Sequence, residues 1–223
     1  MRILDLYCGA GGSAMGYVMA GFQVVGVDKK AQQNWPWPHN FVKVDAMRAL
    51  ELLDLRVYDA IHASPPCQTH SRTRYLQEDR PGDPDEIENL RIMLQAIGKP
   101  YVIENVVGAP LEHPVTLCGS MFPETMGIRR HRIFECPWLE QPAPECRHHL
   151  QVPRFRNPDP RGAELTGVVN VHGSPSYEGE AQLRREVMGI DWMNNYELTQ
   201  AVPPAYTMWL GGQLADYLAR RAA

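Results

Sequence analysis

The stretch that decides the fold is residues 2–12, which read Arg-Ile-Leu-Asp-Leu-Tyr-Cys-Gly-Ala-Gly-Gly. It begins as an apolar strand and ends in a glycine-rich turn. Residues 13–20 then carry apolar side chains at helical spacing and end at Gly21, a residue favoured just after a helix. A strand, a glycine turn and a helix in this order predict a loop that approaches a ligand closely. The helix N-terminus would favour a negative group such as a carboxylate.

The same alternation continues along the chain. Further strands are expected at residues 22–28, 41–45, 57–63 and 101–106, and helices at 46–55, 85–97, 180–188 and 204–218. This spacing predicts right-handed crossovers and therefore an α/β fold with a doubly wound, mostly parallel sheet. Residues 135–179 are rich in proline and arginine and interrupt the pattern. We expect a small, loop-rich insertion there, with residues 1–134 and 180–223 forming the main domain.

Composition narrows the class of protein. The chain has 223 residues, 44% of them hydrophobic and 22% charged, as in ordinary globular domains. It has no apolar run of about 18 residues that could span a membrane, and it enters a strand at once, so we expect a cytoplasmic protein without a membrane partner. The five cysteines are expected to be reduced thiols. We expect a monomer.

Charge is distributed unevenly. The formal net charge of −4 argues against a protein that coats nucleic acid non-specifically. Between residues 129 and 161, however, seven arginines stand against four acids. This local excess could face a phosphate backbone. It could equally be a solvated surface, and the sequence alone leaves both readings open.

Two acids end neighbouring strands. Asp28 ends the strand at 22–28, where a carboxylate can accept hydrogen bonds from both hydroxyls of a ribose. Asp45 ends the next strand and could accept from an adenine amino group. Spacing alone does not distinguish a dinucleotide from S-adenosylmethionine.

Cys67 stands just beyond the strand at 57–63, after two rigid prolines. Polar residues 69–84 follow, and a long loop in that position is typical of a lid. A thiolate near positive groups can act as a nucleophile, whereas an ordinary buried cysteine is the alternative.

Three further charged residues are candidates for the same site. Glu104 ends a strand, and a desolvated glutamate retains its proton more readily. Arg130 and Arg132 alternate, so only one of them is expected to reach a bound base. Together, a nucleotide-cofactor loop, a nucleophilic cysteine, a strand-end glutamate and two arginines are the parts that methylation of cytosine C5 requires.

Cys136, Cys146, His148 and His149 include no Cys-x2-Cys unit, and we expect no metal site.

These motifs resemble the DNA cytosine-5 methyltransferase family over nearly the whole chain. The resemblance rests on the glycine turn at 5–12, Pro-Cys-Gln at 66–68, Glu-Asn-Val at 104–106, Arg-His-Arg at 130–132 and Gln-Ala-Val-Pro-Pro at 200–204. It implies a class I, Rossmann-like methyltransferase that uses S-adenosylmethionine. The substrate would be cytosine in double-stranded DNA, extruded from the helix.

The resemblance also implies roles for individual residues. The catalytic set would be Cys67 as nucleophile, Glu104 as donor to cytosine N3, Arg132 on the base, and Arg130 on a phosphate or the catalytic loop. The cofactor would be bound by Asp5, Tyr7, Cys8, Gly9, Ala10, Gly11, Gly12, Asp28, Lys29, Asp45, Ala46, Pro66, Gln200 and Ala201. DNA would be bound by Gln68, Ser71, Arg72, Arg74, Arg147, Arg154 and Arg156.

The chain departs from the family pattern in several places. Ile128 replaces a glutamine, Gln200 replaces an asparagine, and His70 stands where phenylalanine is common. The insertion is short for a target-recognition region, which predicts a short or degenerate target and is compatible with a phage-encoded enzyme acting in a bacterial host. Three alternatives stay open: methylation of an exocyclic amine, methylation of RNA such as tRNA, and DNA binding with vestigial catalysis.

Overall fold

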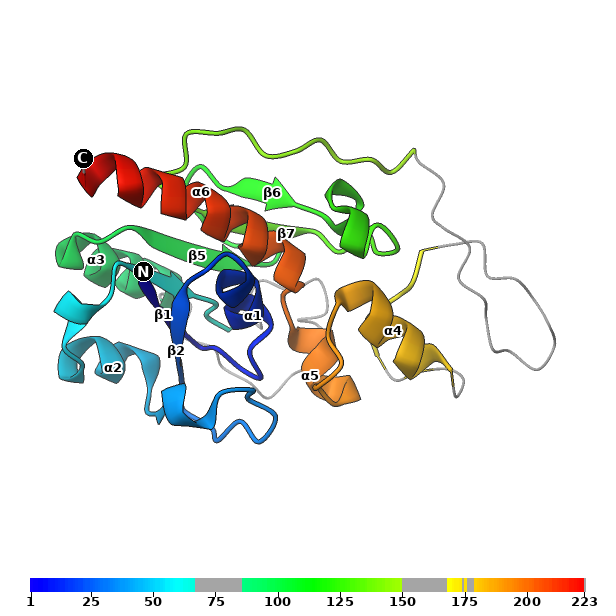
Figure 1. Ribbon diagram of the computed structural model, residues 1–223, viewed down its shortest axis with the longest axis horizontal. Coiled ribbons are helices and arrows are strands. Elements are labelled where there is room, and N and C mark those ends of the chain that lie inside the picture. The colour runs from blue at the N-terminus through cyan, green and yellow to red at the C-terminus, as the bar shows by residue number, and fades with distance from the viewer. Residues whose placement is uncertain (67–85, 150–167, 174, 176–178, 223) are drawn as a thin grey trace.

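The computed structural model describes residues 1–66, 86–149, 168–173, 175 and 179–222 (Figure 1). Its centre is a seven-stranded sheet in the order β3-β2-β1-β4-β5-β7-β6. The strands are β1 (Arg2–Leu6), β2 (Gln23–Asp28), β3 (Phe41–Lys43), β4 (Ala60–Ala63), β5 (Tyr101–Asn105), β6 (Val115–Leu117) and β7 (Arg132–Glu135). Strands β1 to β5 are parallel, and β7 runs antiparallel to both β5 and β6. The prediction of a mostly parallel α/β sheet is confirmed.

Helices follow most of the strands. The α-helices are α1 (Gly12–Met19), α2 (Ala46–Leu52), α3 (Glu86–Ile97), α4 (Glu180–Met188), α5 (Asn195–Gln200) and α6 (Pro204–Ala222). Short 3-10 turns occupy Pro38–Asn40, Leu55–Val57, Gly119–Met121 and Pro123–Thr125.

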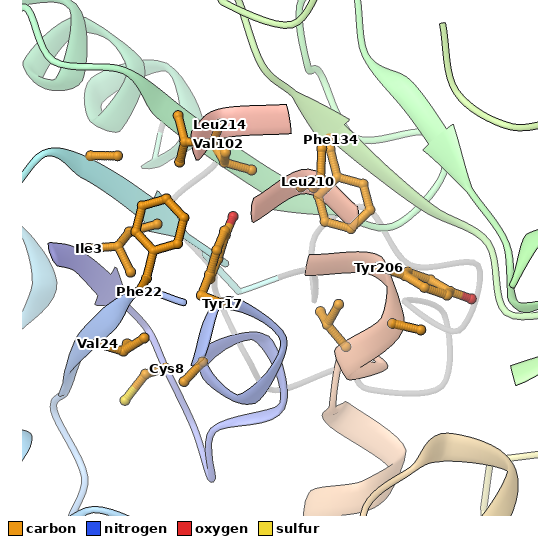
Figure 2. Close-up of a cluster of buried hydrophobic side chains, with 14 of the residues drawn as sticks. Ile3, Cys8, Tyr17, Phe22, Val24, Val102, Phe134, Tyr206, Leu210 and Leu214 are labelled. Carbon is orange, nitrogen blue, oxygen red and sulfur yellow. The ribbon is translucent and has the colours of Figure 1, made fainter. Parts of the chain in front are cut away.

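Alternation along the strands divides the core into two layers. Ile3 packs in one hydrophobic cluster with residues of α1 and α6, whereas its neighbour Leu4 packs in another with residues of α2 and α3. Successive strand side chains point to opposite faces, so each central strand serves both layers. Figure 2 shows the first layer, in which Tyr17 of α1 lies among side chains from β1, β5 and α6.

The contact between α1 and α6 joins the two ends of the chain. A Cβ built on Gly16 would lie 2.1 Å from the carbonyl oxygen of Pro204 and 2.1 Å from Oγ1 of Thr207. Only glycine permits this approach. Thr207 Oγ1 in turn donates to the carbonyl of Ser13 over 2.8 Å. The helix that follows the glycine turn is therefore fixed by the last helix of the chain (Figure 1).

Several local details differ from the sequence expectations. Strand β3 ends at Lys43, because Asp45 caps α2 by accepting from the amides of Met47 and Arg48. Strand β7 begins at Arg132, so Arg130 precedes it. Neither β6 nor α5 was expected. The described residues between 136 and 149 and between 168 and 173 contain no helix or strand, in keeping with a loop-rich segment.

Across the described residues, no helix combines the length and the apolar character needed to cross a membrane.

Candidate active site

A cavity of about 540 Å³ lies where the carboxyl ends of β1, β2, β4 and β5 meet the N-terminus of α1. Its lining includes Gly9, Asp28, Ser64, Glu104 and Gln200. Strand order reverses between β1 and β4, and ligands of open α/β sheets bind at such a switch point. The volume falls within the usual range for small-molecule sites.

The glycine turn forms one wall of the cavity. Gly9 and Gly11 have φ angles of 50° and 88°, a region in which side chains other than glycine are strained. A Cβ on Gly9 would meet no described atom within 4 Å, whereas one on Gly12 would lie 2.5 Å from the carbonyl oxygen of Val202. Gly9 thus leaves room for a ligand, and Gly12 allows the segment after α5 to close against the turn.

Asp28 is held in place by the backbone. One carboxylate oxygen accepts from the amide of Gly9 over 3.1 Å, and the other accepts from the amide of Lys30 over 2.9 Å. Asp45 uses Oδ1 for its helix cap. Both carboxylates line the cavity and retain lone pairs for a ligand.

Asp5 lies behind the wall and does not line the cavity. Its side chain is fully buried, and neither carboxylate oxygen has a hydrogen-bond partner among the described residues. Burial, followed by the charges of Asp28 and Glu104, raises the pKa of Asp5 well above its usual value. Gly11 packs against Trp35 and is likewise absent from the lining, so direct contact of Asp5 or Gly11 with a cofactor stays a prediction.

Glu104 is the central charged group of the site. Its Oε1 lies 2.9 Å from Nε of Arg132, and both side chains are largely buried. Burial raises the pKa of Glu104, while Arg132, a hydrogen bond from Ser64 and Arg130 lower it, and the net direction is upward. A protonated glutamate beside an arginine presents two hydrogen-bond donors to a ligand.

A polar chain leads from Glu104 into the core. Ser64 Oγ lies 3.0 Å from Nε2 of His62, whose Nδ1 lies 3.0 Å from the hydroxyl of Tyr17. Burial lowers the pKa of His62 to about 3, so this imidazole is neutral near neutral pH. The chain fixes Ser64, and through it the orientation of Glu104. Sequence reasoning did not identify it, because His62 and Tyr17 have ordinary core spacing.

Asn105 holds the segment that leads to Cys67. Its side-chain amide donates to the carbonyl of Pro65 over 3.0 Å, and its Oδ1 accepts from the amide of Val106 over 2.9 Å. This hydrogen bond fixes the position of Pro65, and both prolines line the cavity. Cys67 itself lies outside the described residues.

Cys8 also lines the cavity, but it is a different kind of thiol. Burial, then the charges of Asp5 and Asp28, raise the pKa of Cys8 far above its usual value. Cys8 therefore remains protonated and is a poor nucleophile.

Arg130 is buried away from the cavity lining. Its guanidinium donates to the carbonyl of Thr199 over 2.6 Å, and its own carbonyl accepts from the hydroxyl of Tyr206. Its side chain thus fixes the end of α5, and the predicted contact with a phosphate or the catalytic loop stays a prediction. Trp192 fixes the same region by donating from Nε1 to the carbonyl of Ala10 over 2.8 Å.

Most of the other predicted site residues come together. The predicted residues that line the cavity are Tyr7, Cys8, Gly9, Ala10, Gly12, Asp28, Lys29, Asp45, Ala46, Pro66, Glu104, Arg132, Gln200 and Ala201. Arg147 is exposed and donates its backbone amide to Ser120, away from this lining. The predicted residues that lie outside the described part are Cys67, Gln68, Ser71, Arg72, Arg74, Arg154 and Arg156.

Apart from Gln200, sequence reasoning missed the contribution of α5. Tyr196 and Glu197 line the cavity, together with Met193 just before the helix. Asn194 and Glu197 form a capping box, a sequence pattern that could have revealed this helix start.

The first comparison is between this sequence and a model of a protein family. Residues 1–109 match the family described as C-5 cytosine-specific DNA methylase. These residues are thus similar to that family, and they make up just under half of the chain. The matched segment contains the glycine turn, Asp28, Cys67 and Glu104.

Two curated methylases resemble the same part of the chain. The Type II methyltransferase M.DdeI of Desulfomicrobium norvegicum is 29% identical over 117 residues, which cover 48% of this chain and 28% of that protein. The Type II methyltransferase M.HgiGI of Herpetosiphon aurantiacus is 29% identical over 119 residues, which cover 50% of this chain and 94% of that protein. The chain thus covers only a minor part of the first relative.

Solved structures share the fold. A prophage-encoded E. coli protein, described as a candidate DNA modification methyltransferase, has a TM-score of 0.61 at 15% identity. The alignment covers 98% of this chain and 99% of that one. The Entamoeba histolytica methyltransferase EhMeth has a TM-score of 0.51 at 13% identity, covering 100% of this chain and 99% of that one. At these identities the likeness extends to architecture alone.

Proposed function

We propose that the protein transfers a methyl group from S-adenosylmethionine to C5 of cytosine in DNA. The observation that carries this proposal is the placement of Glu104. It lies in one cavity with the glycine turn and Asp28, is paired with Arg132, and faces the proline segment that precedes Cys67. The match of residues 1–109 to the C-5 cytosine-specific DNA methylase model supports the same reaction.

The residues present fit S-adenosylmethionine. Asp28 is positioned for the ribose hydroxyls, and the free face of Gly9 leaves space for a ligand against the turn. The N-terminus of α1 carries no acid in its first turn and would favour the carboxylate of the methionine part. When bound, the cofactor supplies an electrophilic methyl group.

The chain's own residues would activate the cytosine ring. In our proposal the Cys67 thiolate forms a bond to C6, while a protonated Glu104 donates a hydrogen bond to N3 and stabilises the negative charge that develops there. This addition makes C5 nucleophilic. After methylation, loss of the C5 proton to water and departure of the thiolate restore the aromatic ring. Arg132 would hold both Glu104 and the base.

The base must leave the helix for this chemistry. Cytosine inside a duplex cannot reach a cavity at a sheet edge, and extrusion costs a few kcal/mol. Contacts to DNA phosphates would offset that cost. We assign these contacts to the arginine-rich segment after residue 129 and to the residues following Cys67.

The test is methyl transfer from labelled S-adenosylmethionine to mixed-sequence duplex DNA and, in parallel, to tRNA. We expect label in DNA, and bisulfite sequencing should locate it at 5-methylcytosine within a short target. Label in tRNA alone would exclude the DNA substrate, and label in N4-methylcytosine or N6-methyladenine would exclude the cysteine mechanism.

A further inference from the structure

Four metal-ligand side chains meet at one point outside the cavity. Cys118 follows β6, His131 precedes β7, and Cys146 and His148 lie on the connector after β7. Their ligand atoms all lie within 4.8 Å of one another. The residues come from three separate stretches of chain, which is why spacing alone did not reveal them.

The separations are close to those around a tetrahedral ion. Nε2 of His148 lies 3.2 Å from Sγ of Cys118 and 3.1 Å from Sγ of Cys146. Nε2 of His131 lies 3.5 Å from Sγ of Cys146. Zinc binds sulfur at about 2.3 Å and nitrogen at about 2.0–2.1 Å, so tetrahedral ligands lie roughly 3.3–3.8 Å apart. The four ligand atoms are therefore near enough to one another to share one ion.

We propose that Cys118, His131, Cys146 and His148 form a structural zinc site. Two thiolates and two imidazoles are a set that favours zinc. Four protein ligands would leave no open position, as in sites that stabilise structure rather than catalyse reactions. This proposal does not depend on the methylation reaction, because metal content can be measured without it.

The surroundings suit such a site. Cys118 is fully buried at the end of a strand, whereas Cys146 and His148 are exposed on the connector, so a metal could enter from the solvent side. Ser120 Oγ lies 3.4 Å from Sγ of Cys118 and 3.6 Å from Sγ of Cys146. This hydroxyl has one proton and can support one of the two sulfurs at a time from outside the ligand set.

The site would attach the connector to the sheet beside the active site. His131 stands between Arg130, which fixes the end of α5, and Arg132, which pairs with Glu104. An ion bound to His131 would therefore restrict the backbone that orients both arginines. The connector from 136 to 149 has no helix or strand in its described residues, and an ion would add a fixed point to it.

The experiment is metal analysis by mass spectrometry of the full chain, purified without a histidine tag and with reductant. We expect about one zinc per chain in the wild type, falling to near zero in His148→Ala and Cys146→Ala. His149→Ala and Cys136→Ala are matched controls, each altering the same residue type nearby, and should retain the metal. Absence of zinc from zinc-supplemented wild type would overturn the proposal, as would retention of zinc in both ligand variants.

Cobalt substitution of the wild type keeps the proposal testable if the ligand variants fail to fold. Replacement of zinc by Co²⁺ should give the intense visible bands of a tetrahedral site and a thiolate charge-transfer band. Weak octahedral bands would contradict the assignment. So would a Cys118–Cys146 disulfide in protein purified under reducing conditions, detected by peptide mapping.

Discussion

The two halves of the molecule form the active site by different means. Residues 1–109 contain the five parallel strands and the helices between them, and their side chains reach the cavity because parallel strands end at the same edge. Residues 110–222 add Arg132 and the α5 segment to the lining, and individual hydrogen bonds hold that segment in place, such as Arg130 to Thr199 and Trp192 to Ala10. The first half supplies reactive groups by topology, and the second half positions them by individual hydrogen bonds. Substitutions in the two halves should therefore have different effects on methyl transfer, cofactor binding and stability.

The largest effect is expected in the first half, at Cys67. Cys67→Ala removes the proposed nucleophile and should lower methyl transfer by on the order of 10⁴-fold or more. Cofactor binding, measured by calorimetry, should be unchanged, because the glycine turn and Asp28 are untouched. Residual transfer near the wild-type rate would contradict the role of Cys67.

The second prediction concerns the proton on Glu104. Burial raises its pKa, so the folded protein holds this proton more tightly than the unfolded chain does. Its contribution to stability is thus present below the unfolded pKa and is lost as pH rises through the folded pKa. If the protonated form is required, kcat/KM should fall over the same rise in pH.

Two variants separate titration from position at this site. Ser64→Ala removes a hydrogen bond that lowers the pKa of Glu104, so the alkaline limb of kcat/KM should move to higher pH. Glu104→Gln cannot titrate, and should lose that limb while lowering activity by roughly 10²- to 10⁴-fold. If the alkaline limb of kcat/KM stays unchanged in Glu104→Gln, the titrating group is a residue other than Glu104.

The third prediction addresses the junction between the halves. In Gly16→Ala the new Cβ would collide with the carbonyl of Pro204, and no flexible side chain can relieve that contact. We expect a loss of about 2–4 kcal/mol in the free energy of unfolding. In Gly212→Ala, on α6, the Cβ meets nothing within 4 Å, so that change should stabilise by up to about 1 kcal/mol. Equal effects in urea unfolding would show that the junction is not tightly packed.

The smallest effect should come from a single hydrogen bond. Trp192→Phe keeps an aromatic ring, although a smaller one, and removes the donor to the carbonyl of Ala10. Loss of about 0.5–1.5 kcal/mol should weaken cofactor binding by roughly 2- to 10-fold. Trp209→Phe, on α6 against the cluster around Tyr206, is the control and should leave affinity unchanged.

The same contrast explains what the sequence could predict. Strands β1 to β5 and the cavity residues at their ends follow local patterns, because alternation and glycine turns act over a few residues. The hydrogen bond from Arg130 to Thr199 could not be predicted, because the two residues are 69 positions apart and no periodicity links them. Asp5 was expected at the ligand because it belongs to the motif, yet its position on the strand directs it into the core. The cysteine–histidine cluster was missed for the same reason as the hydrogen bond of Arg130.

The most direct test of the account is covalent trapping on duplex DNA that carries 5-fluorocytosine, in the presence of S-adenosylmethionine. Fluorine at C5 cannot leave as a proton does, so a cysteine that has added to C6 stays attached. We expect a stable protein–DNA adduct whose peptide map identifies Cys67, and we expect no adduct with Cys67→Ala. An adduct at another residue, or active methyl transfer without any adduct, would contradict it.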